Sequence, residues 1–170
     1  MRAGPAYGGS CFPKDTRALI DTGKKFNTDL SIVKTVVTSN DKRRFLSIKR
    51  VEKILNNKLL NKTITFLGVT FKPNTDDMRE TSSVPMIKYF NKKKCKIRYF
   101  DPTGEKKEFN NLKNVKYFNN INNACLNSDL IILHTEWNDF KLLNFKKLVK
   151  KRNFKIYDMR NMYSPSKMKK

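Results

Sequence analysis

The chain has 170 residues, of which 38% are hydrophobic and 11% aromatic, enough to bury one compact core with a helical appendage. This composition excludes disorder of the whole chain. There is no apolar run of membrane-spanning length and no apolar stretch of the signal-peptide type, so we expect a cytoplasmic protein. The net charge of +22 is dispersed in short lysine clusters within an asparagine-rich background. That pattern favours a compositional bias over a dedicated polyanion site.

Three cysteines, Cys11, Cys95 and Cys125, form an odd set without a CxxC pair. Their spacing indicates neither a disulfide framework nor a zinc cluster, so we expect no metal site. The single histidine, His134, directly follows the apolar residues 131–133. In that setting a hydrogen-bonded structural histidine is favoured over a metal ligand or a catalytic base.

The first 57 residues are predicted to form a loop followed by two helices. Glycines and prolines interrupt residues 1–13, which are therefore predicted to be a loop. Pro13 suits the start of a short helix over residues 14–25, with Gly23 near its end. Apolar residues recur near helical spacing between Leu30 and Leu55, which predicts a long amphipathic helix with a basic opposite face.

From residue 58 onward, predicted strands and helices alternate. The strands are expected at residues 64–69, 96–100, 115–118, 130–133 and 155–157, and the helices at 83–91, 121–127 and 140–150. Such alternation predicts a parallel sheet flanked by helices. We therefore expect an α/β fold, with a loop and central helical region in residues 1–57 and a compact α/β domain in residues 58–170.

A cysteine precedes the first predicted helix, within the segment Gly-Gly-Ser-Cys-Phe-Pro-Lys-Asp at residues 8–15. Glycines there allow a substrate to approach the backbone closely. The positive end of the helix dipole and the ammonium of Lys14 would both favour the thiolate form of Cys11, which is the nucleophilic form. These residues alone leave open that Cys11 is an ordinary small residue in a turn.

Two segments resemble signatures of the UDP-glucose/GDP-mannose dehydrogenase family. Residues 4–15 are similar to the active-site motif of the family, and residues 67–80 to the start of its UDP-binding domain. Shorter matches at 99–102, 135–137 and 158–161 follow in the same order. The resemblance covers nearly the whole chain. It implies that residues 58–170 are a Rossmann-like UDP-binding domain and that the helix over 30–55 mediates a homodimer, although the apolar stripe of that helix could equally pack within the chain.

The resemblance further implies an NAD-dependent oxidation of UDP-glucose at C6 to UDP-glucuronate. Cys11 matches the nucleophile that forms the thiohemiacetal and thioester intermediates of the family. Asp15 matches the aspartate thought to activate or orient the hydrolytic water. Lys14 and Arg79 match residues on the cofactor side. For Asp15 the alternative is an exposed first-turn aspartate favoured by the helix dipole.

The residues that match substrate-binding positions of the family are Gly4, Gly8, Lys72 and Arg160. A loop that leaves a parallel strand is where open α/β sheets bind ligands, and a diphosphate needs cationic donors. For either Lys72 or Arg79, the alternative is a solvated loop charge. Residues 10–15 resemble the UDP-glucose and GDP-mannose branches, and residues 72–77 favour UDP-glucose.

The sequence also departs from the family pattern. Ala6 stands where many members have glycine, and His134 where an apolar or small residue is usual. No GxGxxG motif follows a predicted strand, and the upstream lysine and asparagine that stabilise oxyanion charge in the family are missing. We therefore expect this chain to be inactive alone and to need a separate N-terminal NAD-binding chain.

A second hypothesis is a non-catalytic nucleotide- or polyanion-binding module derived from the same domain; action on GDP-mannose is a further alternative. Salt dependence separates a polyanion binder from a UDP-sugar binder, because counterion release makes nucleic-acid binding fall steeply with salt. A cysteine hydrolase built on Cys11 and His134 is disfavoured, since nothing in the sequence positions the pair. We expect neither membrane nor nucleic acid as a partner.

Overall fold

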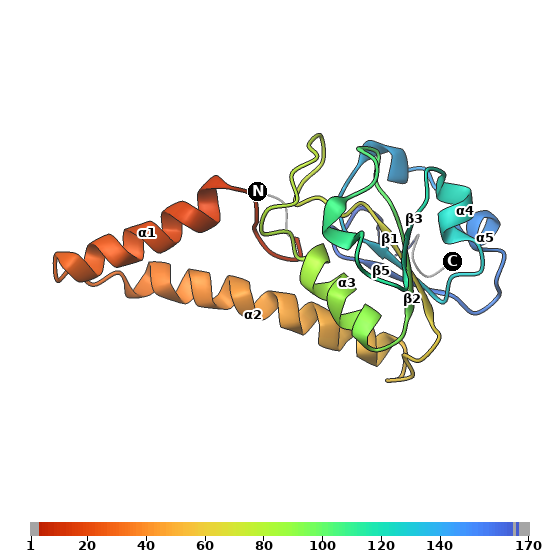
Figure 1. Ribbon diagram of the computed structural model, residues 1–170, viewed down its shortest axis with the longest axis horizontal. Coiled ribbons are helices and arrows are strands. Elements are labelled where there is room, and N and C mark those ends of the chain that lie inside the picture. The colour runs from red at the N-terminus through yellow and green to blue at the C-terminus, as the bar shows by residue number, and fades with distance from the viewer. Residues whose placement is uncertain (1–3, 165, 167–170) are drawn as a thin grey trace.

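The first two helices form an arm beside the rest of the molecule (Figure 1). The computed structural model describes residues 4–164 and 166. Helix α1 spans Cys11–Lys25 and helix α2 spans Ser31–Ile54. The turn between them is tight, since a Cβ added at Gly23 would come within 2.5 Å of the Leu30 side chain. Glycine at this position therefore lets the two helices fold back on each other.

The sheet has five parallel strands in the order β3-β2-β1-β4-β5. The strands are β1 Thr63–Leu67, β2 Lys96–Phe100, β3 Val115–Tyr117, β4 Leu130–Leu133 and β5 Lys155–Asp158. Every residue of β1 and β4 is buried, as expected of strands in a parallel sheet covered on both faces. The predicted α/β fold with a Rossmann-like parallel sheet is confirmed, and all five predicted strands are present.

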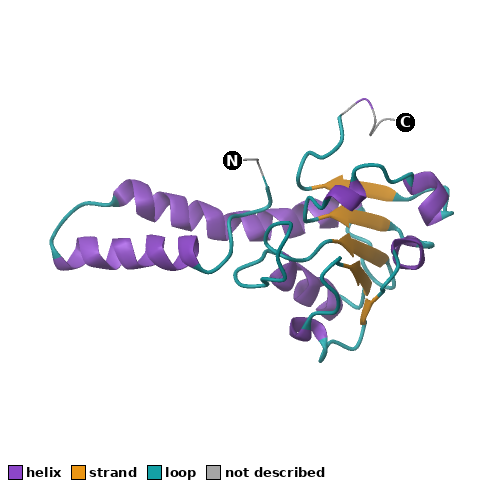
Figure 2. Ribbon diagram, turned by 90° about the horizontal axis from the view of Figure 1, so that it is seen from above, coloured by secondary structure: helices purple, strands orange, loops and turns teal. Residues whose placement is uncertain are grey.

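Helices cover both faces of the sheet (Figure 2). On one face, α3 (Ser83–Lys92) and the end of α2 pack on a core that contains Phe66, Ile97 and Ile132. On the other, α4 (Ile121–Cys125) and α5 (Phe145–Val149) enclose a core that contains Ile131 and Leu133. Neighbouring residues of β4 thus point into different cores, because side chains alternate across a strand.

Only the carboxyl-terminal half of α2 joins the core. Ile48 and Val51 are buried there, whereas Ile32 and Val36, nearer the start of the helix, are exposed. The predicted apolar stripe over residues 30–55 is therefore split: one half packs within the chain and the other faces solvent. Within the described residues, no helix is both long and apolar enough to cross a membrane.

Several predicted boundaries were wrong, and the helix expected over residues 121–127 ends at Cys125. Helix α1 begins at Cys11 rather than at residue 14, so the cysteine belongs to the first turn. Strand β1 ends at Leu67 rather than at residue 69, because Gly68 adopts a φ of +73° that ends the extended run. The expected helix over 140–150 is interrupted: a 3₁₀ turn covers Asn138–Phe140, and Asn144 takes an extended conformation and caps α5 through its side chain.

Candidate active site and nucleotide edge

The Cys11 thiol lies at the first residue of α1 and is exposed to solvent. Its Sγ lies 3.5 Å from the hydroxyl oxygen of Ser10. The other two thiols are buried, and burial raises the pKa of Cys95 to about 11 and that of Cys125 to about 12. Since the thiolate is the nucleophilic form of cysteine, Cys11 is the only cysteine of the chain that can react under mild conditions.

The cysteine loop, residues 4–10, packs on the nucleotide loop, residues 71–80, which follows β1. The Gly9 amide donates a 2.8 Å hydrogen bond to the carbonyl of Arg79. A Cβ at Gly8 would approach the Glu80 carbonyl oxygen to 2.6 Å, and one at Gly9, where φ is +86°, would meet the Phe71 ring at 2.8 Å. Both glycines are therefore required by the close approach of the two loops.

Helix α2 holds the cysteine loop through polar side chains. Asn40 is buried, accepts a hydrogen bond from the Tyr7 amide at 2.8 Å and donates one to the Tyr7 carbonyl at 3.2 Å. Arg43 donates to the carbonyls of Gly4 and Pro5, at 3.0 and 3.4 Å. The loop before the thiol is thus fixed by groups far along the chain, and sequence reasoning assigned no role to Asn40 or Arg43.

Glu80 joins three parts of the molecule. Its carboxylate lies 2.6 Å from Arg44 of α2 and 3.5 Å from Arg17 of α1. The hydrogen bond from Arg44, reinforced by the charges of both arginines, lowers the pKa of the Glu80 carboxyl. Arg44 also donates to the Glu80 carbonyl at 3.2 Å. Glu80 is the last residue of the segment 67–80 that resembles the family, but its partners Arg17 and Arg44 lie on helices outside that segment.

Lys14 and Asp15, the predicted cofactor and catalytic residues next to the thiol, form an exposed ion pair. The Lys14 Nζ lies 2.5 Å from an Asp15 carboxylate oxygen. This hydrogen bond, with a smaller contribution from the charge of Cys11, raises the pKa of Lys14. Cys11 and Asp15 are four residues apart, so they project from the same side of α1.

The two cations predicted on the nucleotide loop are both exposed. Arg79 donates to both oxygens of Asp77, at 3.0 and 2.9 Å, and this interaction lowers the pKa of Asp77. Asp77 raises the pKa of Arg79, with a smaller contribution from the charge of Cys11. The Lys72 ammonium lies 5.4 Å from the centroid of the Phe71 ring. Both cations belong to the loop between β1 and α3.

Arg160 is largely buried and fastens the carboxyl ends of several strands. It donates to the carbonyls of His134 and Phe71, at 2.8 and 2.7 Å, and its Nε lies 2.9 Å from a Glu136 carboxylate oxygen. Burial lowers its pKa. A Cβ at Gly4 would lie 2.6 Å from the Arg160 guanidinium. Two of the predicted substrate residues, Gly4 and Arg160, are therefore in contact. Most of the Arg160 guanidinium donates hydrogen bonds to main-chain carbonyls.

His134 is a structural histidine, as its apolar setting predicted. It is fully buried, its Nε2 lies 2.8 Å from the Ser82 hydroxyl, and its Nδ1 lies 3.1 Å from the Thr135 hydroxyl. Thr135 donates to the Thr70 carbonyl at 2.7 Å. Desolvation lowers the pKa of His134 to about 3. The neutral histidine thus contacts Ser82, just after the nucleotide loop, and is linked to Thr70, just before the loop, through Thr135.

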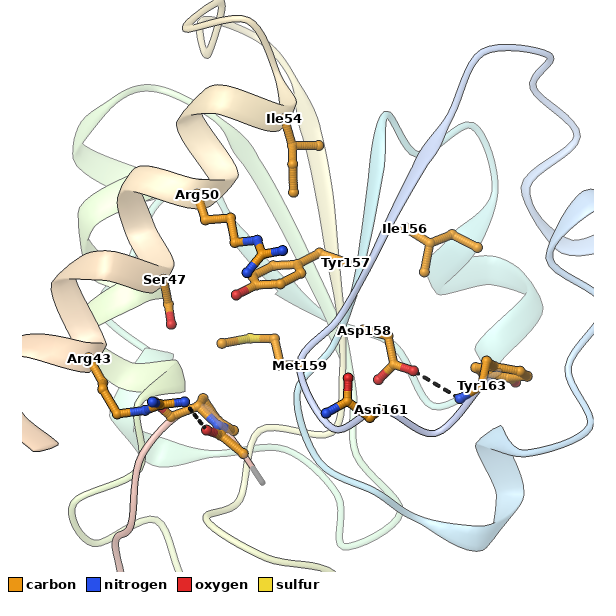
Figure 3. Close-up of a pocket in the computed structure, with 12 residues that line it drawn as sticks. Arg43, Ser47, Arg50, Ile54, Ile156, Tyr157, Asp158, Met159, Asn161 and Tyr163 are labelled. Atoms are coloured by element: carbon orange, nitrogen blue, oxygen red, sulfur yellow. Dashed lines mark hydrogen bonds between the residues drawn. The ribbon is translucent and has the colours of Figure 1, made fainter. Parts of the chain in front are cut away.

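Two open cavities adjoin these residues. The first, of about 470 Å³, lies between α2 and the end of β5, where Arg43 and Arg50 face Tyr157 and Asn161 (Figure 3). Of the predicted site residues, only Gly4 lines it. The second, of about 500 Å³, lies between Asp76–Arg79 and the loop after β2. The predicted substrate residues therefore do not share one of these cavities. Gly8, Lys72 and Arg160 each contact Phe71, and Gly4 contacts Arg160.

The sheet itself does not form a dinucleotide cradle. A Cβ at Gly68, directly after β1, would lie 2.5 Å from Thr135, which fills the position where a glycine-rich turn approaches a pyrophosphate. At the end of β2, the buried Asp101 accepts hydrogen bonds from the Val69 amide and from Thr103. This carboxylate is therefore unavailable to a ribose. Neither position fits NAD, and the two exposed cations Lys14 and Arg79 do not make a cradle by themselves.

Comparison with known proteins identifies the chain. Residues 65–165 match the UDP binding domain of the UDP-glucose/GDP-mannose dehydrogenase family, and residues 1–42 match its central domain. The chain belongs to this family. The resemblance inferred from the two sequence segments is therefore confirmed, and the chain carries the UDP-binding domain of a family of nucleotide-sugar dehydrogenases.

Several named relatives agree with this assignment. The chain is 36% identical to UDP-glucose 6-dehydrogenase of Rickettsia felis, a match over 100% of this chain and 39% of the relative. It is 35% identical to UDP-glucose 6-dehydrogenase YwqF of Bacillus subtilis, over 96% of this chain and 38% of the relative. A UDP-glucose dehydrogenase from Pyrobaculum islandicum superimposes with a TM-score of 0.80 at 28% identity, covering 94% of this chain and 35% of that one. This chain thus spans about 40% of the length of its curated relatives.

Proposed function

We propose that the chain is the part of a UDP-glucose 6-dehydrogenase that binds the UDP-sugar and presents the catalytic thiol. One observation carries the proposal. The cysteine loop packs directly on the nucleotide loop through the hydrogen bond from Gly9 to Arg79, so an exposed thiol and two exposed cations lie on neighbouring segments. A sugar nucleotide could thereby meet cationic donors at its diphosphate and a nucleophile at its sugar.

In this proposal, Cys11 attacks the aldehyde derived from the C6 hydroxyl. The thiolate sulfur forms a bond to C6 and the carbonyl oxygen takes up the displaced electron pair, which gives a thiohemiacetal. Oxidation of that adduct leaves a thioester, whose carbon–sulfur bond is broken by water to release the carboxylate and the thiolate. Asp15, on the same side of α1 as Cys11, would accept the proton from that water.

Gly4, Gly8, Lys72 and Arg160 are the proposed substrate residues. Lys72 would pair with the diphosphate, since its ammonium is exposed and has no ion pair within the described residues. Gly4 and Gly8 would line the path of the sugar nucleotide along the cysteine loop. Arg160 would act mainly by holding Phe71 beside that path, because its guanidinium already serves main-chain carbonyls.

NAD would supply the oxidant, and Lys14 and Arg79 are the cations proposed to face it. Because the sheet does not fit a dinucleotide, we propose that the cofactor is held by an NAD-binding domain outside these 170 residues. We further propose a homodimer that uses the exposed apolar half of α2. Ile32 and Val36, which are 79% and 44% exposed, support such an interface.

Calorimetric titration with UDP-glucose tests the proposal, with GDP-mannose and a short single-stranded DNA as competitors at moderate and high salt. We expect binding that persists at high salt and prefers UDP-glucose. The Lys72→Ala variant should bind about tenfold more weakly, the cost of one charged hydrogen bond. Lys146→Ala, which removes an equally exposed charge from α5, should bind as the wild type does.

The alternative is a module that binds nucleotides or polyanions without catalysis. The size of the net charge, +22, supports it, whereas the dispersal of that charge in short clusters counts against a dedicated polyanion site. Under that alternative, DNA would compete with UDP-glucose, all binding would fall steeply with salt, and the two lysine variants would lose the same small amount. That result would overturn the assignment to UDP-glucose.

A further inference from the structure

Three segments that are distant in sequence meet at Glu80. The nucleotide loop ends there, α1 contributes Arg17 and α2 contributes Arg44. The residue adopts a φ of +53°, a left-handed conformation that is uncommon outside glycine. This conformation places its carbonyl oxygen against Gly8 and lets it accept a hydrogen bond from Arg44. Both the main chain and the side chain of Glu80 therefore contact the parts of the molecule that carry Cys11.

The contacts around Glu80 form a short route between the nucleotide loop and the thiol. Arg79 is exposed and precedes Glu80, and its carbonyl accepts the hydrogen bond from Gly9, two residues before Cys11. A ligand that pairs with Arg79 or Lys72 would restrict the same loop whose backbone holds Gly9. Glu80 fixes the end of that loop to both helices of the arm.

We infer that Glu80 is a positioning residue that holds the Cys11 end of α1 on the nucleotide loop. Through this contact, a sugar nucleotide bound at the loop would fix the thiol, and by linkage a fixed thiol would strengthen nucleotide binding. The coupling rests on the proposed function, whereas the positioning by Glu80 depends only on the contacts described here.

Matched variants separate this role from general stabilisation. Glu80→Gln keeps the shape of the side chain and removes the charge that Arg44 and Arg17 share. Glu52→Gln is the control: Glu52 accepts a 2.6 Å hydrogen bond from Tyr89 and so ties α2 to α3, with the same length as the Arg44–Glu80 contact. The control removes an equivalent charged hydrogen bond that does not touch the cysteine loop.

The first readout is hydrogen exchange of the Gly9 amide, measured by NMR on the chain without ligand. In Glu80→Gln we expect exchange about fivefold faster than in the wild type, the scale of one partly exposed charged hydrogen bond. Glu52→Gln should leave Gly9 unchanged. Arg44→Gln removes the contacts of Arg44 to both the carboxylate and the carbonyl of Glu80. It should therefore raise the exchange rate at least as much as Glu80→Gln, and the double variant should add little to Arg44→Gln.

The second readout is alkylation of Cys11 by iodoacetamide with and without saturating UDP-glucose, followed by mass spectrometry of the Cys11 peptide. We expect UDP-glucose to slow alkylation in the wild type and in Glu52→Gln, and to do so several-fold less in Glu80→Gln at full saturation. An unchanged Gly9 amide in Glu80→Gln, or an equal change in Glu52→Gln, would overturn the positioning role. If UDP-glucose binds no variant, the proposed function fails while the Gly9 comparison still decides the role of Glu80.

Discussion

The cysteine loop is held in place by hydrogen bonds and ion pairs, whereas the sheet domain is packed around two apolar cores. Asn40, Arg43 and Glu80 secure the loop, while residues such as Phe66 and Ile131 are completely buried on opposite faces of the sheet. Apolar packing responds little to pH or salt, but exposed ion pairs are screened. The position of the thiol should therefore change with pH and salt more than the sheet does.

Truncation of the apolar core should have the largest effect. Phe66→Ala removes a fully buried ring from the central strand, and we expect the free energy of unfolding to fall by about 3–5 kcal/mol. Urea unfolding followed by circular dichroism measures the loss. Leu142→Ala, at a side chain that is 94% exposed, should change stability by less than about 0.5 kcal/mol. Similar effects of both variants would contradict the assignment of the core.

The next effect concerns His134, a buried histidine of the sheet domain. His134 stays neutral when folded, with a pKa lowered to about 3, but can bind a proton in the unfolded chain near its ordinary value of 6.5. The unfolded state therefore gains protons as the pH falls below that value. The stability advantage of the wild type over His134→Gln should shrink by about 3 kcal/mol between pH 7 and pH 4. Denaturant titrations across this range test it, and a constant difference would show that His134 does not titrate on unfolding.

A smaller effect is expected when a hydrogen-bonded contact between α2 and the cysteine loop is removed. Asn40→Ala leaves the amide and carbonyl of Tyr7 without their side-chain partner, which should cost about 1–2 kcal/mol in local opening of the cysteine loop. Amide exchange at Gly9 reports that opening. Ser39→Ala, at the exposed neighbouring position of α2, is the matched control. If Asn40→Ala lowered the unfolding midpoint of the whole domain as strongly as Phe66→Ala, the contrast between the cysteine loop and the apolar core would be wrong.

The smallest effect on stability is expected on the exposed half of α2. Ile32→Ser replaces a side chain that is 79% exposed, so the free energy of unfolding should change by less than about 0.5 kcal/mol. The same substitution should weaken self-association if this surface pairs two chains. Sedimentation of both proteins over a range of concentrations distinguishes the outcomes. A wild type that stays monomeric would contradict the proposed dimer but would not affect the comparison between the cysteine loop and the sheet domain.

The sequence was sufficient to predict the order of the strands along the chain and the parallel sheet. Residues 130–133 are a continuous apolar run, and residues 64–67 are apolar except for Thr65. Through the resemblance it also predicted that Cys11 and the nucleotide loop belong to one site, which stays a prediction. It did not reveal Asn40 or Glu80 as anchors of the cysteine loop. Their partners lie 33 and 36 residues away in the chain, and a single sequence gives no signal for such pairings.

The predicted boundaries of helices and strands were wrong where a single residue changed the local backbone conformation. Gly68 ends β1 by turning to positive φ, and Asn144 interrupts the helix expected over residues 140–150 by adopting an extended conformation. Both residue types are compatible with more than one conformation, so periodicity alone could not place them. The contacts that select the observed conformation, such as that between Gly68 and Thr135, come from the tertiary fold.

The burial of Cys95 and Cys125 has a consequence for oxidative stress. Peroxide should convert Cys11 to a sulfenic acid, since this thiol alone is exposed. With the other two thiols enclosed and protonated, the chain offers no resolving partner for an internal disulfide. A second molecule or a small thiol would have to cap the sulfenic acid before it advanced to the irreversible sulfinic form. Oxidative damage to this protein should therefore appear first as loss of one titratable thiol with the fold intact.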